Sequence, residues 1–128
     1  MSQRKPIYHD FEIRTGPPLG DGYPYVARGP GRGRVGAGYL RLPFVWEEIM
    51  PQLASWRAAD HAGVSAERDA EGVSPFQRLG QALYEALFST TVQNLYRQSL
   101  EEAEGRLRLV LTLSQPELAR LPWEYLHD

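Results

Sequence analysis

The stretch from Gly105 to Asp128 shows the clearest alternation of apolar and polar positions in the chain. Leu107, Leu109, Leu111 and Leu113 fall on one face of this stretch, and Arg106, Arg108, Val110 and Thr112 fall on the other. A period of two is typical of a half-buried strand. Residues 114–117 then read Ser-Gln-Pro-Glu, which predicts a capping box and a helix start. We therefore predict a strand, a short helical turn through Arg120, and a second turn from Pro122.

Alternation also marks the first third of the chain. Residues 7–14 place Ile7, His9, Phe11 and Ile13 on one side, which predicts a first strand. Residues 23–28 and 39–42 predict two more strands, and Pro24 restricts the second of them to a sheet edge. The turn dipeptide Asp21-Gly22 and a Gly/Arg loop at residues 29–38 separate them. Three strands joined by turns predict an antiparallel meander.

From Pro43 the apolar positions change to helical spacing. Residues 45–56 predict a first helix, which Pro51 either kinks or begins. Residues 74–77 read Ser-Pro-Phe-Gln, a capping box that begins a second helix. Thr90 with Gln93 predicts the cap of a third helix, which Gly105 ends. The fold class is therefore α+β, with a three-stranded meander, about three helices and a further strand.

Three segments follow from these patterns. Residues 1–57 hold the meander and the first helix, and residues 58–72, which are small, polar and charged, form a flexible connection. Residues 73–128 hold the helical pair, the last strand and the opening turn of a truncated domain. That final segment ends on Trp123, Tyr125 and Leu126, although free termini are usually polar. We expect it to be the middle of a domain rather than its end.

Charge and composition exclude several classes of protein. Residues 1–42 carry seven basic and three acidic side chains, while the whole chain has a net charge of −2. The arginines are not interleaved with a stacking platform, so we interpret them as surface charge rather than as a nucleic-acid site. The absence of cysteine excludes disulfides, thiolate metal sites and a cysteine nucleophile. Without a secretory signal or a run of about 20 apolar residues, we predict a cytoplasmic protein that does not enter a membrane.

Isolated motifs do not add up to a reactive or ligand-binding centre. Gly31, Gly33 and Gly36 match the dinucleotide fingerprint by letter, but a strand follows them where that motif needs a helix, so a hairpin connection is preferred. His9-Asp10 and His127-Asp128 lack a second spaced histidine, and adjacent strand residues point to opposite faces. We predict no metal, no cofactor and no catalytic residue. The three tryptophans and seven tyrosines are interpreted as core or interaction surface in preference to a ligand cleft.

The run RLRLVLTLSQPELARLPWEYLHD closely resembles the entry into a CHAT domain, the caspase-like peptidase domain associated with TPR proteins. Upstream, the segments FEIRTGPPLGDGYPYVAR, GYLRLPF and GQALYEALF, followed by VQNLYRQSLEEAEGRLRL, resemble the leader that precedes this entry. The resemblance covers almost the whole chain except residues 58–72. It implies that the last strand joins a caspase-like α/β sheet assembled from residues beyond Asp128.

The same resemblance implies a cysteine peptidase with a His–Cys dyad, and neither dyad segment is present in this chain. The residues that match the family motif have a structural role, namely Pro116, Glu117, Leu118, Leu121, Pro122, Trp123 and Glu124. Trp123 is expected to be a packing anchor. Arg106 and Arg108 are either contacts for an acidic partner or the outward face of a paired strand, and Tyr125 is a further candidate contact.

Two functions remain open at this point. In the first, the chain is the non-catalytic N-terminal portion of a CHAT-family peptidase, packing onto the peptidase part or coupling it to another protein subunit. It would then expose apolar surface near Trp123, Tyr125 and Leu126 and self-associate through it. In the second, it is an independent module that binds a protein or peptide through an open sheet edge.

Overall fold

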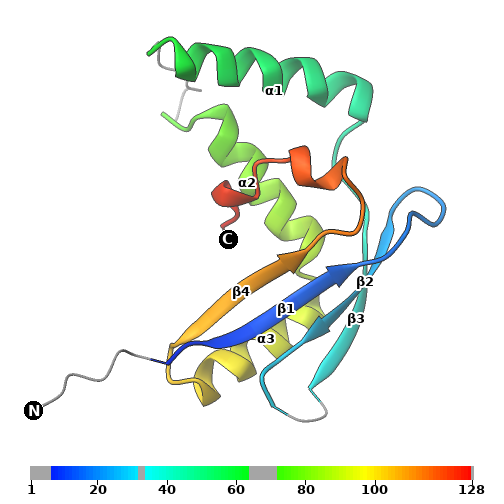
Figure 1. Ribbon diagram of the computed structural model, residues 1–128, viewed down its shortest axis with the longest axis vertical. Helices are drawn as coiled ribbons and strands as arrows, with labels where there is room; N and C mark the ends of the chain where they lie inside the picture. Colours follow the sequence, from blue (N-terminus) through cyan, green and yellow to red (C-terminus); the bar gives the residue numbers. More distant parts are fainter. Residues whose placement is uncertain (1–6, 32–33, 64–71, 128) are drawn as a thin grey trace, which may run out of the picture.

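The computed structural model describes residues 7–31, 34–63 and 72–127 of the chain. Figure 1 shows the arrangement of the elements in these ranges. In chain order they are β1 (His9–Thr15), β2 (Tyr23–Arg28), β3 (Val35–Leu40), α1 (Trp46–His61), α2 (Pro75–Leu87), α3 (Thr90–Glu102), β4 (Leu107–Thr112) and the 3-10 turns η1 (Leu118–Arg120) and η2 (Trp123–Tyr125). The predicted α+β class is confirmed.

The strands form one mixed sheet with the order β3-β2-β1-β4. β1, β2 and β3 pair antiparallel as the predicted meander, with Ile13 opposite Ala27 and Val26 opposite Ala37. β4 pairs parallel to β1, with Phe11 opposite Leu109. A parallel neighbour requires a crossover connection, and α1, α2 and α3 lie in that connection. The further strand predicted from the leucine alternation therefore joins the meander at its β1 side.

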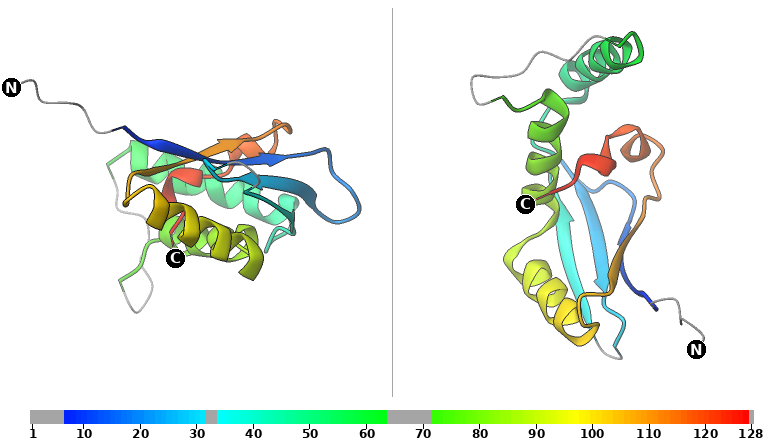
Figure 2. Two further views of the ribbon diagram at one scale, coloured as in Figure 1. Left: turned by 90° about the horizontal axis from the view of Figure 1, so that it is seen from below. Right: turned by 90° about the vertical axis from the view of Figure 1, so that its left-hand side faces the viewer.

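The helices α2 and α3 cover one face of the sheet, while α1 lies beyond the end of the strands (Figure 2). Phe11 and Ile13 of β1 point to the covered face and are 0% exposed. Phe11 meets Tyr96 of α3 edge to face, with ring centroids 5.1 Å apart. The Tyr25 hydroxyl donates a hydrogen bond to the carbonyl of Leu87, at the end of α2. Among the described residues, no element covers the opposite face.

The third strand differs from the prediction. It begins at Val35, inside the segment predicted as a Gly/Arg loop, and ends at Leu40 rather than at residue 42. Gly36 and Gly38 occupy its covered face, where a β-carbon at Gly38 would overlap the ring of Tyr25. The close approach of that ring requires glycine, but glycine at alternate positions removes the apolar period by which a strand is recognised.

Pro24 also lies where the sequence did not predict it. β2 is an interior strand, paired with β1 on one side and with β3 on the other. The Pro24 carbonyl accepts from the Gly16 N–H at 2.8 Å, so the backbone groups of residue 24 face the β1 side. The β1–β2 pairing ends one residue earlier, at Thr15 and Tyr25. The missing N–H therefore falls at the end of a ladder, where it costs one terminal hydrogen bond.

The first helix is longer than predicted. α1 continues to His61 with Pro51 inside it, so residues 58–61 belong to the helix rather than to a flexible connection. Ala58 and Ala59 favour helix strongly enough to extend it. The rest of the predicted connection, residues 64–71, lies outside the described residues. Ile49 and Leu53 are the buried side chains of α1.

One of the three predicted caps is confirmed. Ser74 and Gln77 form a reciprocal capping box at α2, with Pro75 at the first helical position. α3 is capped one residue earlier than predicted, because the Ser89 hydroxyl accepts from the Val92 N–H. Ser114 forms no cap, since η1 is a 3-10 turn without a side-chain cap. The Ser114 N–H instead donates to the Thr15 hydroxyl at 3.1 Å and continues the β1–β4 contact.

Candidate functional site

The outer side of β4 has no neighbouring strand in the described part of the chain. The His9 N–H donates to the Arg106 carbonyl at 2.9 Å, which fixes the direction of the backbone groups along β4. In a parallel ladder, the N–H and C=O groups of every second residue bond to the strand on one side, and those of the residues between them point to the other side. The even-numbered residues of β4 therefore face β1, and the N–H and C=O groups of Leu107, Leu109 and Leu111 face outward. We call this row of groups, with the leucine side chains, the β4 edge.

The β4 edge is also apolar. The side chains of Leu107, Leu109 and Leu111 lie on the covered face, level with Phe11 and Ile13 of β1. The two β1 side chains are 0% exposed, whereas the leucines are only half-buried against the core. Native sheets usually protect such an edge with charge, proline, a bulge or a covering element. β4 holds no proline, and the described elements leave its leucines partly open.

A hollow of about 370 Å³ lies beside β4 on the helical side. Its lining includes Tyr84 in the last turn of α2 and Phe88 directly after that helix. The two rings stack with centroids 4.5 Å apart. Phe88 in turn meets Tyr96 of α3 edge to face at 5.5 Å. We call it the aromatic hollow, and its full lining is Tyr84, Phe88, Tyr96, Leu109, Leu126 and His127. Leu109 belongs to both the hollow and the β4 edge, so the two form one continuous surface.

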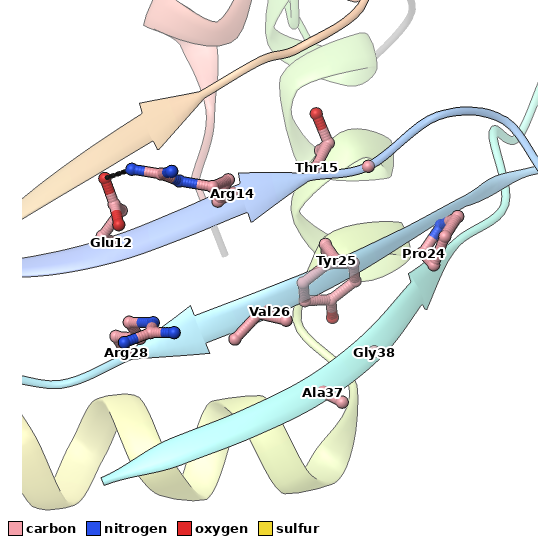
Figure 3. A pocket seen from close by; sticks show the side chains of 10 residues that line it. Glu12, Arg14, Thr15, Pro24, Tyr25, Val26, Arg28, Ala37 and Gly38 are labelled. Carbon is pink, nitrogen blue, oxygen red and sulfur yellow. Dashed lines mark hydrogen bonds and ion pairs between the residues drawn. The ribbon is translucent and has the colours of Figure 1, made fainter.

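A second hollow, of about 640 Å³, lies over β1, β2 and β3 and is shown in Figure 3. We call it the sheet-face hollow. The side chains of Glu12 and Arg14 come from β1, and those of Val26 and Arg28 come from β2. All four belong to positions that alternate with the buried residues of their strands. The hollow is therefore part of the face that α2 and α3 leave uncovered.

Arg106 and Arg108, the arginines predicted as possible contacts, have different surroundings. Arg108 lies on the uncovered face, where its guanidinium Nε donates to the Asp10 carboxylate at 2.9 Å. Asp10 is the residue opposite Arg108 in the β1–β4 register, so this is a cross-strand ion pair. Arg106 precedes β4 and is exposed. Of the two predicted roles for Arg108, the outward face of a paired strand fits this geometry.

The residues of the predicted family motif brace the end of the fold. Leu118 is 0% exposed and Leu121 is buried beside it in the core. The Trp123 indole N–H donates to the Leu118 carbonyl at 2.7 Å, which closes the turn from within. Glu117 accepts a hydrogen bond from the Tyr23 hydroxyl of β2 at 3.0 Å. Pro122 is buried, while Pro116 and Glu124 are exposed.

The C-terminal aromatic stretch is less exposed than predicted. Tyr125 stacks on Phe76 of α2 with ring centroids 5.0 Å apart. Trp123, Tyr125 and Leu126 are half-buried and pack against the core. The stretch folds back over α2 because Gly80 has no side chain and admits the backbone of residue 125. The apolar surface predicted near Trp123, Tyr125 and Leu126 is therefore partly covered within the chain, and self-association through it stays a prediction. The most exposed large apolar residues include Ile7, Leu19 and Val35.

The histidines of the described residues lie apart from one another, and burial shifts the pKa of two tyrosines. No group of three or more His, Asp or Glu side chains there has the arrangement of a metal site. His9, His61 and His127 are exposed and come from separate segments, and Gly33 of the glycine motif lies outside the described ranges. Burial raises the pKa of Tyr23 and of Tyr25 above the ordinary value of 10.0. None of the helices in the described ranges has the length and apolarity that crossing a bilayer requires.

Sequence reasoning identified the β4 leucines but not the two hollows. Tyr84 and Phe88 lie four residues apart on one helical face, which is the signal that links them. Tyr96, Leu109 and Leu126 come from three other segments, and only the tertiary fold brings them together.

A scan against protein-family models, a search of curated proteins and a search of solved structures each found no match to this chain.

Proposed function

We propose that this chain is the non-catalytic N-terminal portion of a CHAT-family caspase-like cysteine peptidase, and that its β4 edge receives a further strand. The resemblance of residues 105–128 to the entry of that domain supports the family. The unpaired edge carries the mechanism, because the outward backbone groups of Leu107, Leu109 and Leu111 offer a ladder to one more strand. The role is structural or regulatory, coupling the peptidase part or another subunit to this sheet.

The half-buried leucines provide the driving force for that addition. A strand beside β4 would cover the exposed parts of Leu107, Leu109 and Leu111, and apolar burial contributes roughly 25 cal/mol per Å². Every second side chain of the added strand would point to the helical side, toward the aromatic hollow. The proposal therefore specifies an extended segment with apolar residues at alternate positions.

A second candidate is an independent module that binds a protein or peptide through the same β4 edge. It is favoured by the way the C-terminal segment completes the core of this chain, with Leu118 and Leu121 buried and Tyr125 stacked on Phe76. Both candidates use one surface and differ in the origin of the added strand. A cytoplasmic location belongs to the proposal in either form and is supported by the absence of cysteine.

The reading frame of the gene distinguishes the two candidates. A frame that continues past Asp128 with a His-Gly segment and a later cysteine supports the peptidase portion. A stop codon directly after Asp128, with a monomeric and cooperatively folded protein, supports the independent module and removes the CHAT assignment.

The β4 edge is tested by comparing two substitutions at Leu111. Both Leu111→Pro and Leu111→Ala remove the leucine side chain, but only the proline removes an outward N–H donor. The probe is a fluorescein-labelled peptide of alternating valine and threonine. One lost hydrogen bond is worth about 0.5–1.5 kcal/mol, so the proline variant should bind it roughly 2- to 10-fold more weakly than the alanine variant.

Circular dichroism of both variants shows whether the sheet and helices remain formed. A further variant, Leu109→Lys, places a charge beside the aromatic hollow and should weaken binding without removing a backbone donor. If the three folded variants and the unmodified chain bind the peptide equally, the β4 edge is not the binding surface and the proposed mechanism fails.

A further inference from the structure

The β2–β3 half of the uncovered sheet face carries a group of apolar side chains, which we call the floor and which comprises Pro24, Val26, Val35, Ala37 and Tyr39. Cross-strand pairing places Val26 opposite Ala37, and Arg28 opposite Val35. Pro24 and Tyr39 form the next pair on the same face. Val26 and Tyr39 are each 38% exposed, and Val35 is 56% exposed. Large apolar side chains that gather on one face in this way mark an interaction surface, whereas scattered ones do not.

Charged residues line the floor on its β1 side, and their balance is uneven. The Arg14 guanidinium lies 3.4 Å from the Glu12 carboxylate, which also accepts from the Thr112 hydroxyl at 3.0 Å. Arg28 stands across from Glu12 in the β1–β2 register, yet it makes no ion pair with any described residue. Figure 3 shows Arg14 and Arg28 along the same hollow as Val26. The Arg28 guanidinium therefore lies beside an exposed apolar floor without a carboxylate partner among the described residues.

From this arrangement we infer that the uncovered face binds an acidic amphipathic helix of a partner protein. Leucine-type side chains at helical spacing would cover Val26, Ala37 and Val35. A carboxylate on the flank of that helix would pair with Arg28, whose planar guanidinium suits two parallel hydrogen bonds. This surface lies on the face opposite the aromatic hollow, so the inference stands independently of the proposed strand addition.

The chemistry of the face favours such a helix over a polyanion. A nucleic acid would bring a row of phosphates, but of the two arginines that line the hollow only Arg28 lacks an ion pair with a described residue, because Arg14 is paired with Glu12. Stacking of successive bases needs several aromatic side chains, whereas Tyr39 is the single aromatic residue in the cross-strand pairs of the floor and the side chains of Val26 and Ala37 are aliphatic. One surplus arginine above an apolar floor instead suits a helix with an apolar stripe and a few carboxylates.

The probe that tests this inference is a synthetic helical peptide of about five turns, roughly 18 residues. It carries leucines along one stripe and glutamates on both flanks, and a matched peptide has lysine at every glutamate position. Fluorescence anisotropy with the full chain should show the glutamate peptide binding about tenfold more tightly than the lysine peptide. Amide shift changes in NMR spectra should then gather on β2 and β3.

Three variants locate the site. Arg28→Glu should abolish the preference for the glutamate peptide, and Val26→Asp should weaken both peptides by placing a charge in the floor. Arg97→Glu is the matched control, because Arg97 is an exposed arginine on α3, away from the uncovered face. It makes the same change in net charge and should keep the preference.

Several outcomes would overturn the inference. Equal binding of the two peptides removes the charge argument, and equal losses in the Arg28→Glu and Arg97→Glu variants reduce the effect to net charge. If sedimentation shows a dimer that Val26→Asp dissociates, the occupant of the face is a second copy of the chain. Retained glutamate selectivity together with a failed Leu111 comparison would instead uphold this inference and refute only the strand addition.

Discussion

Two tyrosines of β2 connect the sheet to distant segments through their hydroxyl groups. The Tyr23 hydroxyl donates to the Glu117 carboxylate at 3.0 Å, and the Tyr25 hydroxyl donates to the Leu87 carbonyl. Burial raises the pKa of both tyrosines, and for Tyr23 the hydrogen bond to Glu117 and its negative charge raise it further. The folded chain therefore requires both phenols in their neutral form.

This requirement predicts that stability falls in alkaline solution. A pKa that is higher in the folded than in the unfolded state contributes stability that is fully present below the ordinary value of 10.0. That contribution is lost as the pH rises through the folded-state pKa. Urea titrations between about pH 8 and about pH 11 should show a declining free energy of unfolding. Tyr23→Phe, which cannot ionise, should show a shallower decline.

A free energy of unfolding that stays level across this range would contradict the argument. At neutral pH the Tyr23→Phe variant should still lose about 0.5–1.5 kcal/mol, because the Glu117 carboxylate loses its donor. The alkaline decline in stability and the loss of the Tyr23–Glu117 hydrogen bond can be measured separately, because only the loss of the hydrogen bond is independent of pH.

At the scale of elements, the contact between α2 and η2 depends on Gly80. A β-carbon at this position would overlap the carbonyl group of Tyr125. Alanine at an open helical position usually stabilises by roughly 0.5–1 kcal/mol relative to glycine. Gly80→Ala should instead destabilise by about 1–3 kcal/mol, because the backbone of η2 must shift. An open helical position and the described contact predict changes of opposite sign in the free energy of unfolding, so the measurement distinguishes them.

Chemical denaturation followed by circular dichroism measures this change. Gln81→Ala, at the exposed neighbouring position of α2, is the control and should leave stability nearly unchanged. A gain in stability for Gly80→Ala would mean that η2 does not rest on α2 as described.

The predictability of each element followed from how much of its pattern is local. The strand at β4 and the capping box at Ser74 were predictable, because leucine alternation and a four-residue cap are complete within their own segments. β3 was not, because its glycines are set by the Tyr25 ring that lies over them. Pro24 was assigned to an edge because the sequence does not show where the β1–β2 ladder ends.

The candidate surfaces were predictable only in part, for the same reason. The β4 edge follows from the leucine alternation, but its unpaired side is a property of the strand order. The aromatic hollow joins Tyr84, Tyr96 and Leu126 from three segments, and no local spacing links them. The sheet-face hollow needs the β2–β3 register, which places Val26 beside Ala37.

For the whole molecule, the segment after β4 acts as a strap that contacts the sheet, α1 and α2. The Arg120 carbonyl accepts from the Arg57 guanidinium of α1 at 2.8 Å. Glu117 accepts from Tyr23 of β2, and Tyr125 stacks on Phe76 of α2. Leu118 lies among these contacts and is 0% exposed. The sheet, α1 and α2 thus share one core that the strap completes.

Because that core is shared, a destabilising substitution in the strap should lower the stability of the whole chain in a single cooperative transition. Leu118→Ala should lower the free energy of unfolding by about 2–5 kcal/mol, the range for a buried leucine that leaves a cavity. Leu113→Ala, at a half-buried leucine, is the matched control and should cost less. Tryptophan fluorescence, which reports on Trp123 and α1, and circular dichroism should shift to the same new midpoint. If fluorescence changes while the circular dichroism transition stays in place, the strap is an appendage, and the chain without it is already a complete folding unit.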